Sequence, residues 1–107
     1  MKRFFNLDTR AYEDGALDRR TKELCGLVAS LVLRCDDCVT YHLGQCAEIG
    51  LTDSELHDAL NVGLIVGGSI VIPHLRRAFA RIEELRALAI PAASDASRAD
   101  TTTDGES

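Results

Sequence analysis

Two cysteines three residues apart, in the run Cys35-Asp-Asp-Cys38, are the side chains best suited to chemistry in this sequence, and His42 follows four residues later. At about 100° per residue, a helix that begins near Cys35 places both thiols and this imidazole within one sector of about 60°. Backbone N–H groups at a helix start stabilise a thiolate, and an imidazole can accept the proton of Cys38. The spacing therefore predicts a nucleophilic or redox-active thiol.

Glu23 is predicted to orient this imidazole, because it lies twelve residues before Cys35 in an otherwise apolar segment. An antiparallel helical hairpin would bring its carboxylate over the face that carries His42. A carboxylate bound to an imidazole fixes the tautomer and stabilises the charged form. We therefore expect a relay from Glu23 through His42 to Cys38. The alternative is an ordinary surface carboxylate in the first turns of a helix.

Helices are the elements expected to position these residues, since no sustained strand-like alternation occurs. Capping residues and apolar periodicity predict four helices, at residues 18–33, 35–50, 52–68 and 69–89, and residues 4–13 are expected to add a short helical turn. Asp18 is the expected cap of the first, Gly50 is expected to end the second, and Thr52 with Glu55 forms a capping box for the third. The fold class is therefore all-α, with about five helices.

The chain of 107 residues is long enough for one domain, which we place at residues 1–91. Residues 92–107 hold no large apolar side chain and carry a net charge of −3, so we expect a disordered polar tail. The third helix is apolar nearly all round, and a bundle of this size cannot cover every side of it. We therefore expect an obligate homo-oligomer.

Charge and hydropathy exclude several partners. The net charge of −5 lacks the clustered positive charge of a nucleic-acid-binding protein, and no apolar run is long enough to span a membrane. No secretory signal is visible near Met1, so the expected location is cytoplasmic. Cysteines in a reducing compartment favour redox or metal chemistry over a structural disulfide framework.

The motif resembles a known pattern. Glu23, the run Arg34-Cys-Asp-Asp-Cys38 and Tyr41-His42 look like the E-x11-C-x2-C-x3-H signature of the carboxymuconolactone decarboxylase-like superfamily, in its alkyl hydroperoxidase AhpD-like branch. Further similar segments are Gly15-Ala-Leu-Asp18, Gly50-Leu-Thr52 with Glu55, and Gly67-Gly68, so the resemblance covers about residues 12–80.

The resemblance implies an all-helical subunit that assembles as a homotrimer or homohexamer. It also implies a thiol peroxidase or dithiol–disulfide oxidoreductase that needs no cofactor beyond a redox-active disulfide between Cys35 and Cys38. By position, Cys38 forms the sulfenic acid, Cys35 closes the disulfide, and Glu23 and His42 relay protons. The substrate would be a hydroperoxide or a disulfide, and the electron donor a dihydrolipoyl or thioredoxin-like protein.

One position departs from that pattern. The peroxidases of the family carry a second histidine just before the second cysteine, where this chain has Asp37. A negative charge at this position disfavours the thiolate. The alternative function is therefore a non-redox decarboxylase of the carboxymuconolactone type, or a structural oligomer of the same fold. The retained cysteine pair favours redox chemistry, because lactone decarboxylation needs a proton donor and an anion clamp but no dithiol.

The other candidate residues have simpler interpretations. Cys35, Cys38, His42 and Cys46 superficially resemble a zinc knuckle, but eleven residues of one helix separate the outer pair by about 16 Å. We therefore expect no metal. Cys25 and Cys46 are expected to be small buried hydrophobes, and His57 a solvated surface residue. His74 is expected to face either an oligomer interface or the site. The arginines of the last helix are expected to form a solvated face or, alternatively, to line an entry for an acidic substrate.

Overall fold

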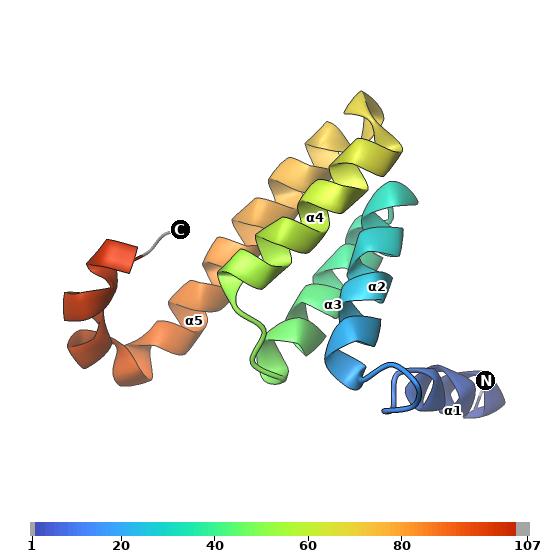
Figure 1. Ribbon diagram of the computed structural model, residues 1–107, viewed down its shortest axis with the longest axis horizontal. Coiled ribbons are helices and arrows are strands. Elements are labelled where there is room, and N and C mark those ends of the chain that lie inside the picture. Colours follow the sequence, from blue (N-terminus) through green and yellow to red (C-terminus); the bar gives the residue numbers. More distant parts are fainter. Residues whose placement is uncertain (1, 105–107) are drawn as a thin grey trace.

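The computed structural model describes the backbone of residues 2–104 and the side chains of residues 3 and 6–89. This part of the chain contains five α-helices, one short 3-10 helix and no strand (Figure 1). Their bounds are α1 Lys2–Ala11, α2 Arg19–Val32, α3 Asp36–Glu48, α4 Asp53–Gly67, η1 Ser69–Val71 and α5 Ile72–Asp104. The predicted all-α class and number of helices are therefore confirmed. None of these helices is long and apolar enough to cross a membrane.

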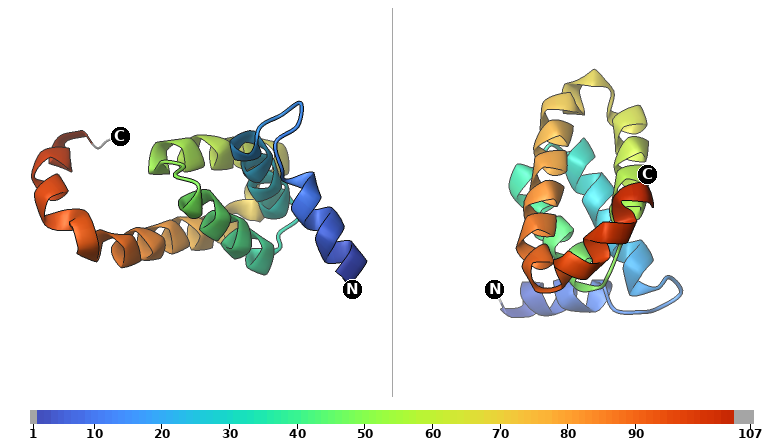
Figure 2. Two further views of the ribbon diagram at one scale, coloured as in Figure 1. Left: turned by 90° about the horizontal axis from the view of Figure 1, so that it is seen from below. Right: turned by 90° about the vertical axis from the view of Figure 1, so that its left-hand side faces the viewer.

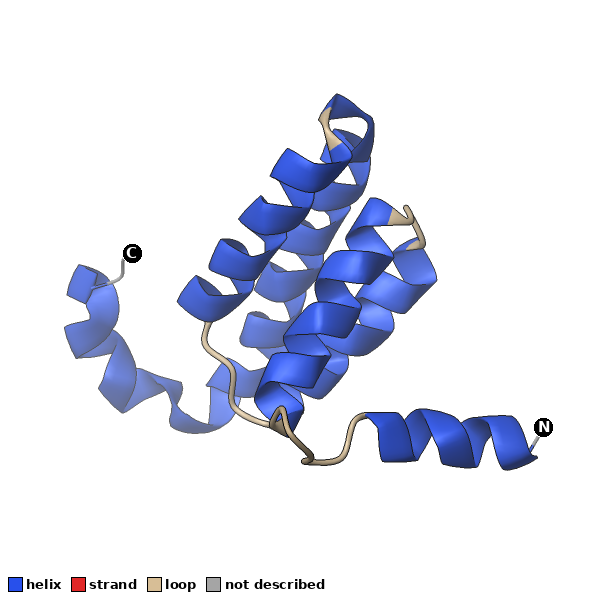
Figure 3. Cartoon of the chain, turned by 45° about the vertical axis from the view of Figure 1, so that its right-hand side comes forward, coloured by secondary structure: helices blue, strands red, loops and turns tan. Residues whose placement is uncertain are grey.

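Helices α2 to α5 form a bundle, and α1 projects from one end of it (Figures 1 and 3). Helix α2 packs against α3 and α4, and α5 packs against the same two helices from the opposite corner. All four contribute to one core, whose largest fully buried side chains are Leu27, Leu31, Leu43, Leu60, Val71 and Cys46. The helices thus bury against one another the apolar faces that their amphipathic sequence patterns predicted.

Helix boundaries follow local capping chemistry. The Asp18 carboxylate accepts the Thr21 backbone N–H at 2.8 Å and caps α2. Thr52 and Glu55 form a reciprocal capping box at the start of α4. Gly50 and Gly68 follow α3 and α4 with φ of 84° and 80°, a conformation that glycine adopts without strain. The predicted helix ends are confirmed at these positions.

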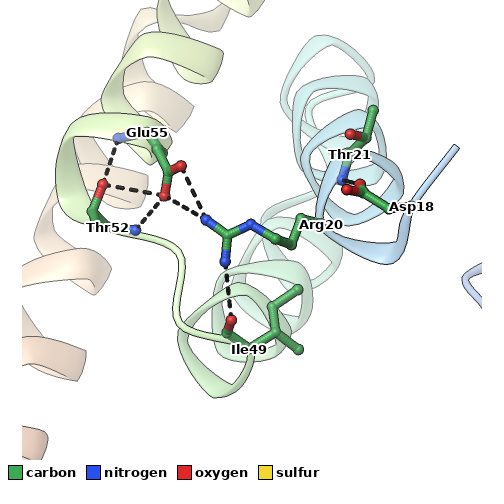
Figure 4. A network of polar contacts seen from close by, with 6 residues as sticks. All are labelled: Asp18, Arg20, Thr21, Ile49, Thr52 and Glu55. Carbon is green, nitrogen blue, oxygen red and sulfur yellow. Dashed lines mark hydrogen bonds and ion pairs between the residues drawn. The ribbon is translucent and has the colours of Figure 1, made fainter. Parts of the chain in front are cut away.

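Arg20 joins three helices near the end of the bundle from which α1 projects (Figure 4). Its guanidinium donates from Nη2 to both carboxylate oxygens of Glu55, each at 3.0 Å, and from Nη1 to the Ile49 carbonyl at 3.2 Å. The contacts link the start of α2 to the end of α3 and the start of α4. Because Glu55 also receives the Thr52 N–H, its pKa is held below the usual value.

The last helix is longer than predicted. The expected end lay near Ala89, whereas α5 continues as helix to Asp104, and its final segment extends beyond the bundle and bends sharply (Figure 2). Pro91 lies within it and removes one backbone donor, while the alanines that follow have the highest intrinsic helix propensity. Only four of residues 92–104 are alanines and most of the others are Ser, Asp or Thr, so neither propensity nor an apolar pattern predicts this extension. The disorder predicted for residues 92–107 stays a prediction, because their side chains and residues 105–107 lie outside the described part of the chain.

Candidate functional site

The turn between α2 and α3 positions the cysteine pair. Arg34 has a φ of 62°, and its N–H donates to the Leu31 carbonyl at 2.9 Å, while the Cys35 N–H donates to the Ser30 carbonyl at 3.0 Å. These two bonds complete a Schellman motif with arginine in the left-handed position that glycine usually fills. The backbone of Cys35 is therefore fixed by the end of α2 before α3 begins.

Cys35 is also the N-cap of α3. Its sulfur accepts the Cys38 backbone N–H at 3.2 Å, and a disulfide joins Cys35 to Cys38 with 5.2 Å between the Cα atoms. This separation lies within the usual range for disulfides. Cys38 is exposed and Cys35 is half-buried. The more exposed cysteine thus lies in the first turn of a helix, where backbone N–H groups favour a thiolate once the bond is reduced.

Glu23 of α2 and His42 of α3 meet inside the bundle. The His42 Nδ1–H donates to Glu23 Oε1 at 2.9 Å, and the two residues are 9% and 2% exposed. The predicted contact is confirmed, and the surface interpretation of Glu23 is wrong. Because the Nδ1–H of the neutral imidazole is hydrogen-bonded to the carboxylate, Nε2 carries no proton and keeps a free electron pair. His42 follows Cys38 by four residues, so it lies about one turn further along the same side of α3.

Two tyrosines and one glycine surround this imidazole. The Tyr12 and Tyr41 ring centroids lie 5.4 and 5.2 Å from that of His42. The imidazole edge that carries Nε2 lies against Gly26, where a Cβ atom would stand 2.9 Å from Cε1 and 3.1 Å from Nε2. Only a residue without a side chain leaves room for this edge. Gly26 is therefore required by the close approach of α2 to His42.

A cavity of about 260 Å³ borders the relay at Glu23. Its lining residues come from α1, the following loop, α2 and α3: Asp8, Thr9, Tyr12, Glu13, Arg19, Glu23, Tyr41 and Gln45. Glu23 thus lines this space and also binds His42. Burial and the negative charge of Glu23 raise the pKa of Tyr12, so its phenol stays protonated at neutral pH.

The two remaining cysteines occupy different environments. Cys46 is fully buried in the core, and burial together with the Glu23 charge raises its pKa to about 12. The prediction of a buried Cys46 is confirmed, whereas that for Cys25 is wrong, because Cys25 is free and exposed. It lies on an apolar groove between α2 and α4. Its apolar neighbours indicated burial, but they belong to a face that the described part of the chain leaves uncovered.

A second polar cluster reaches the cysteine pair from α5. The His74 Nδ1–H donates to Asp36 Oδ1 at 2.7 Å, and Arg77 Nε donates to Asp36 Oδ2 at 3.0 Å. The hydrogen bond from His74, helped by the Arg77 charge, holds the pKa of Asp36 below its usual value. Of the two placements expected for His74, the structure shows the one near the site. His57 is exposed, as predicted, with its ring 4.9 Å from that of Phe79.

Sequence reasoning missed several members of this site. Tyr12 and the contacts of Asp36 with His74 and Arg77 depend on packing between distant segments, which no spacing rule encodes. Gly26 did carry a signal, because an isolated glycine within an apolar helix often has a packing reason. Among residues with described side chains, no three His, Cys, Asp or Glu residues are grouped so as to hold a metal ion.

Comparisons with known proteins indicate one family. The sequence profile of the carboxymuconolactone decarboxylase family matches residues 1–81. A family protein from Thermotoga maritima, with a suggested role in antioxidative response, has a crystal structure that is similar to this one with a TM-score of 0.78 and 62% identity, over 81% of this chain and 90% of that one. A family protein from Legionella pneumophila, crystallised in its apo form, is similar with a TM-score of 0.74 and 30% identity, over 78% and 75% of the two chains.

A further relative is an uncharacterized protein of the cox locus of Paracoccus denitrificans. It is 28% identical over 82 residues, which cover 77% of this chain and 74% of the relative. The matched region spans α1 to α4 and the first part of α5, so it includes every residue of the cysteine pair and its relay. Together with the helical fold, this match establishes that the chain belongs to the carboxymuconolactone decarboxylase family.

Proposed function

We propose that this protein is a dithiol peroxidase, which reduces hydroperoxides with Cys38 and Cys35 and is regenerated by a thiol donor. The observation that carries the proposal is the buried 2.9 Å contact between Glu23 and His42, one turn of α3 from Cys38. A buried carboxylate and imidazole beside a helix-start thiol are the parts that an activated sulfur nucleophile needs. The antioxidative role suggested for the relative from Thermotoga maritima agrees with this chemistry.

Cys38 is the proposed attacking residue. Its thiol proton passes to His42 Nε2, and Glu23 stabilises the imidazolium that forms. The thiolate sulfur then attacks the terminal oxygen of the hydroperoxide and the O–O bond breaks. The departing alkoxide takes a proton from the imidazolium and leaves as an alcohol, while Cys38 becomes a sulfenic acid.

Cys35 is the proposed resolving residue. Its thiol attacks the Cys38 sulfur, the S–O bond breaks, and water leaves as the disulfide forms. The Cα separation of 5.2 Å allows this bond without a large backbone movement. A dithiol donor of the dihydrolipoyl or thioredoxin-like class then returns both cysteines to thiols and is itself oxidised to a disulfide. The cycle uses two electrons and no further cofactor.

Rates of hydroperoxide reduction by reduced variants test this mechanism. Cys38→Ser should abolish sulfenic acid formation, and His42→Ala should slow it by roughly 10²–10⁴-fold, the usual contribution of a general base. Glu23→Gln keeps the shape of the side chain but removes its charge, so its rate should fall between those of His42→Ala and wild type. His57→Ala removes an exposed imidazole elsewhere and is the control. Wild-type rates in both Glu23→Gln and His42→Ala would contradict the relay.

Asp37 is expected to limit the rate. It is exposed in the first turn of α3, next to Cys38. Its charge stabilises the helix start but disfavours the neighbouring thiolate. Asp37→His removes that charge and supplies a second imidazole, so we expect faster reaction with hydroperoxide. Asp37→Asn separates the two effects, because it removes the charge alone.

We also propose that the chain assembles as a homotrimer or homohexamer through the groove between α2 and α4. The groove encloses about 560 Å³, and its lining residues carry no charge: Thr21, Leu24, Cys25, Val28, Ala29, Val32, Ala59, Val62 and Val66. Val62 and Val66 are 56% and 68% exposed, and Ile65 beside them is 81% exposed. A large uncharged apolar face of this kind is typical of a contact between protein chains.

A further inference from the structure

The second cluster, formed by Asp36, His74 and Arg77, has no part in the relay described above. Asp36 is the first residue of α3 and lies between the two cysteines in sequence. Each of its carboxylate oxygens receives one donor from α5, at 2.7 Å from His74 and 3.0 Å from Arg77. The donors are 38 and 41 residues away in sequence, so only the packing of α5 on α3 brings them to this turn.

The negative charge of Asp36 affects how easily Cys35 and Cys38 form thiolates. A carboxylate one residue from Cys35 and two from Cys38 disfavours both thiolates, because like charges raise each other's energy. Arg77 is permanently cationic and offsets that charge, while the His74 N–H binds the other carboxylate oxygen. The Asp36 side chain is 43% exposed, so solvent screens part of the effect.

We propose that Arg77 and His74 are positioning residues for the dithiol, which act by neutralising and fixing the Asp36 carboxylate between the two cysteines. The proposal rests on the dithiol function argued above and adds α5 to the site. The other charged or titratable groups near the pair are Asp37, Tyr41 and His42 on α3 and Glu23 on α2, together with Arg34 in the connecting turn. These groups stay unchanged in the test.

The test measures how the alkylation rate of Cys38 by iodoacetamide depends on pH. A Cys25→Ser/Cys35→Ser background leaves Cys38 as the accessible thiol, and serine keeps an oxygen that can cap α3. In this background Arg77→Gln exposes Asp36 without its cation. We expect the pH midpoint of alkylation to rise by about half to one unit, which is a roughly three- to tenfold smaller thiolate fraction below the midpoint. Arg77→Lys keeps the positive charge, so its pH midpoint of alkylation should stay close to that of the background with Arg77.

Two controls separate this effect from a general one. Arg76→Gln changes the net charge equally at the neighbouring exposed residue of α5 and should leave the midpoint unchanged. Asp36→Asn removes the carboxylate, so adding Arg77→Gln to it should produce no further shift. An equal shift with and without Asp36, or an equal shift in Arg76→Gln, would overturn the proposal, as would no shift in Arg77→Gln.

The proposed role of Arg77 and the proposed peroxidase activity can fail independently of each other. Alkylation needs no hydroperoxide, so the expected midpoint pattern in a protein that does not reduce hydroperoxides would refute the proposed peroxidase and leave the role of Arg77 intact. Normal peroxide reduction with no Arg77-dependent shift would do the reverse. His74→Leu removes the second donor and is expected to shift the midpoint in the same direction as Arg77→Gln, with the same dependence on Asp36.

Discussion

Replacing Gly26 by alanine perturbs the relay without substituting Glu23, His42 or either cysteine. The added Cβ would lie 2.6 Å from the Tyr12 hydroxyl and 2.9 Å from His42 Cε1, whereas carbon atoms in contact are normally about 3.5–4.0 Å apart. Tyr12 can move its hydroxyl aside, since it is the end of a long side chain. His42 cannot shift without stretching its 2.9 Å bond to Glu23.

The expected magnitudes follow from these contacts. Alanine favours a helix over glycine by about 0.5–1 kcal/mol, while overpacking a close contact costs about 1–3 kcal/mol. We therefore expect Gly26→Ala to lower the free energy of unfolding by about 1 kcal/mol. A displaced imidazole should slow the reaction of Cys38 with hydroperoxide by roughly 10- to 100-fold, because catalysis by a general base depends on its position.

Gly44→Ala is the matched control. Gly44 lies in α3, and apart from the backbone of its own helix no atom approaches its Cβ position within 4 Å. This variant should gain about 0.5–1 kcal/mol of stability and react at the wild-type rate. Urea unfolding and stopped-flow oxidation measure the two quantities. If Gly26→Ala behaves like Gly44→Ala in both assays, the imidazole does not depend on this contact and our account of the site is wrong.

Three further predictions concern the rest of the molecule. Because the pKa of Cys46 is raised from 9.0 to about 12, its thiolate fraction at pH 8 is about a thousandfold below that of an ordinary thiol, so mass spectrometry after brief alkylation of the reduced protein should find Cys38 modified and Cys46 intact. The hydrogen bond from the Thr21 N–H lowers the pKa of Asp18 below its usual value of 3.8. The stabilisation from this cap is therefore complete above the pKa of Asp18 in the unfolded chain, and it is lost as the pH falls through the lowered pKa of the folded state. In Asp18→Asn the free energy of unfolding should fall less on acidification than in the wild type. Val66→Glu places a charge on the apolar groove and should dissociate the assembly in sedimentation experiments, whereas a monomeric wild type at micromolar concentration would contradict the oligomer.

Local chemistry explains which parts of the fold were predictable. Asp18, Thr52 with Glu55, and Gly50 act through contacts within a few residues, so their types and spacing suffice to place helix ends. The end of α5 carries no such signal near Ala89. There the apolar pattern fades and Ser, Asp and Thr residues follow, so the sequence predicts an earlier helix end than the structure shows.

The site shows the same division. Glu23 and His42 lie on helices that are consecutive in sequence, and a hairpin is the simplest arrangement of such helices, so their contact could be predicted. Asp36 meets His74 and Arg77 only because α5 returns to pack on α3, which depends on the whole bundle. Cys25 shows a third case, since an apolar neighbourhood in sequence does not distinguish the core from an exposed apolar face.

Mass spectrometry of the reduced protein after one equivalent of an organic hydroperoxide tests the central claim most directly. The account predicts that Cys35 and Cys38 lose their reactivity toward an alkylating agent together, that a peptide linked by their disulfide appears, and that one equivalent of alcohol forms. A dithiol should then restore both thiols. If the hydroperoxide leaves both cysteines alkylatable and no alcohol forms, the pair is not a peroxidase site.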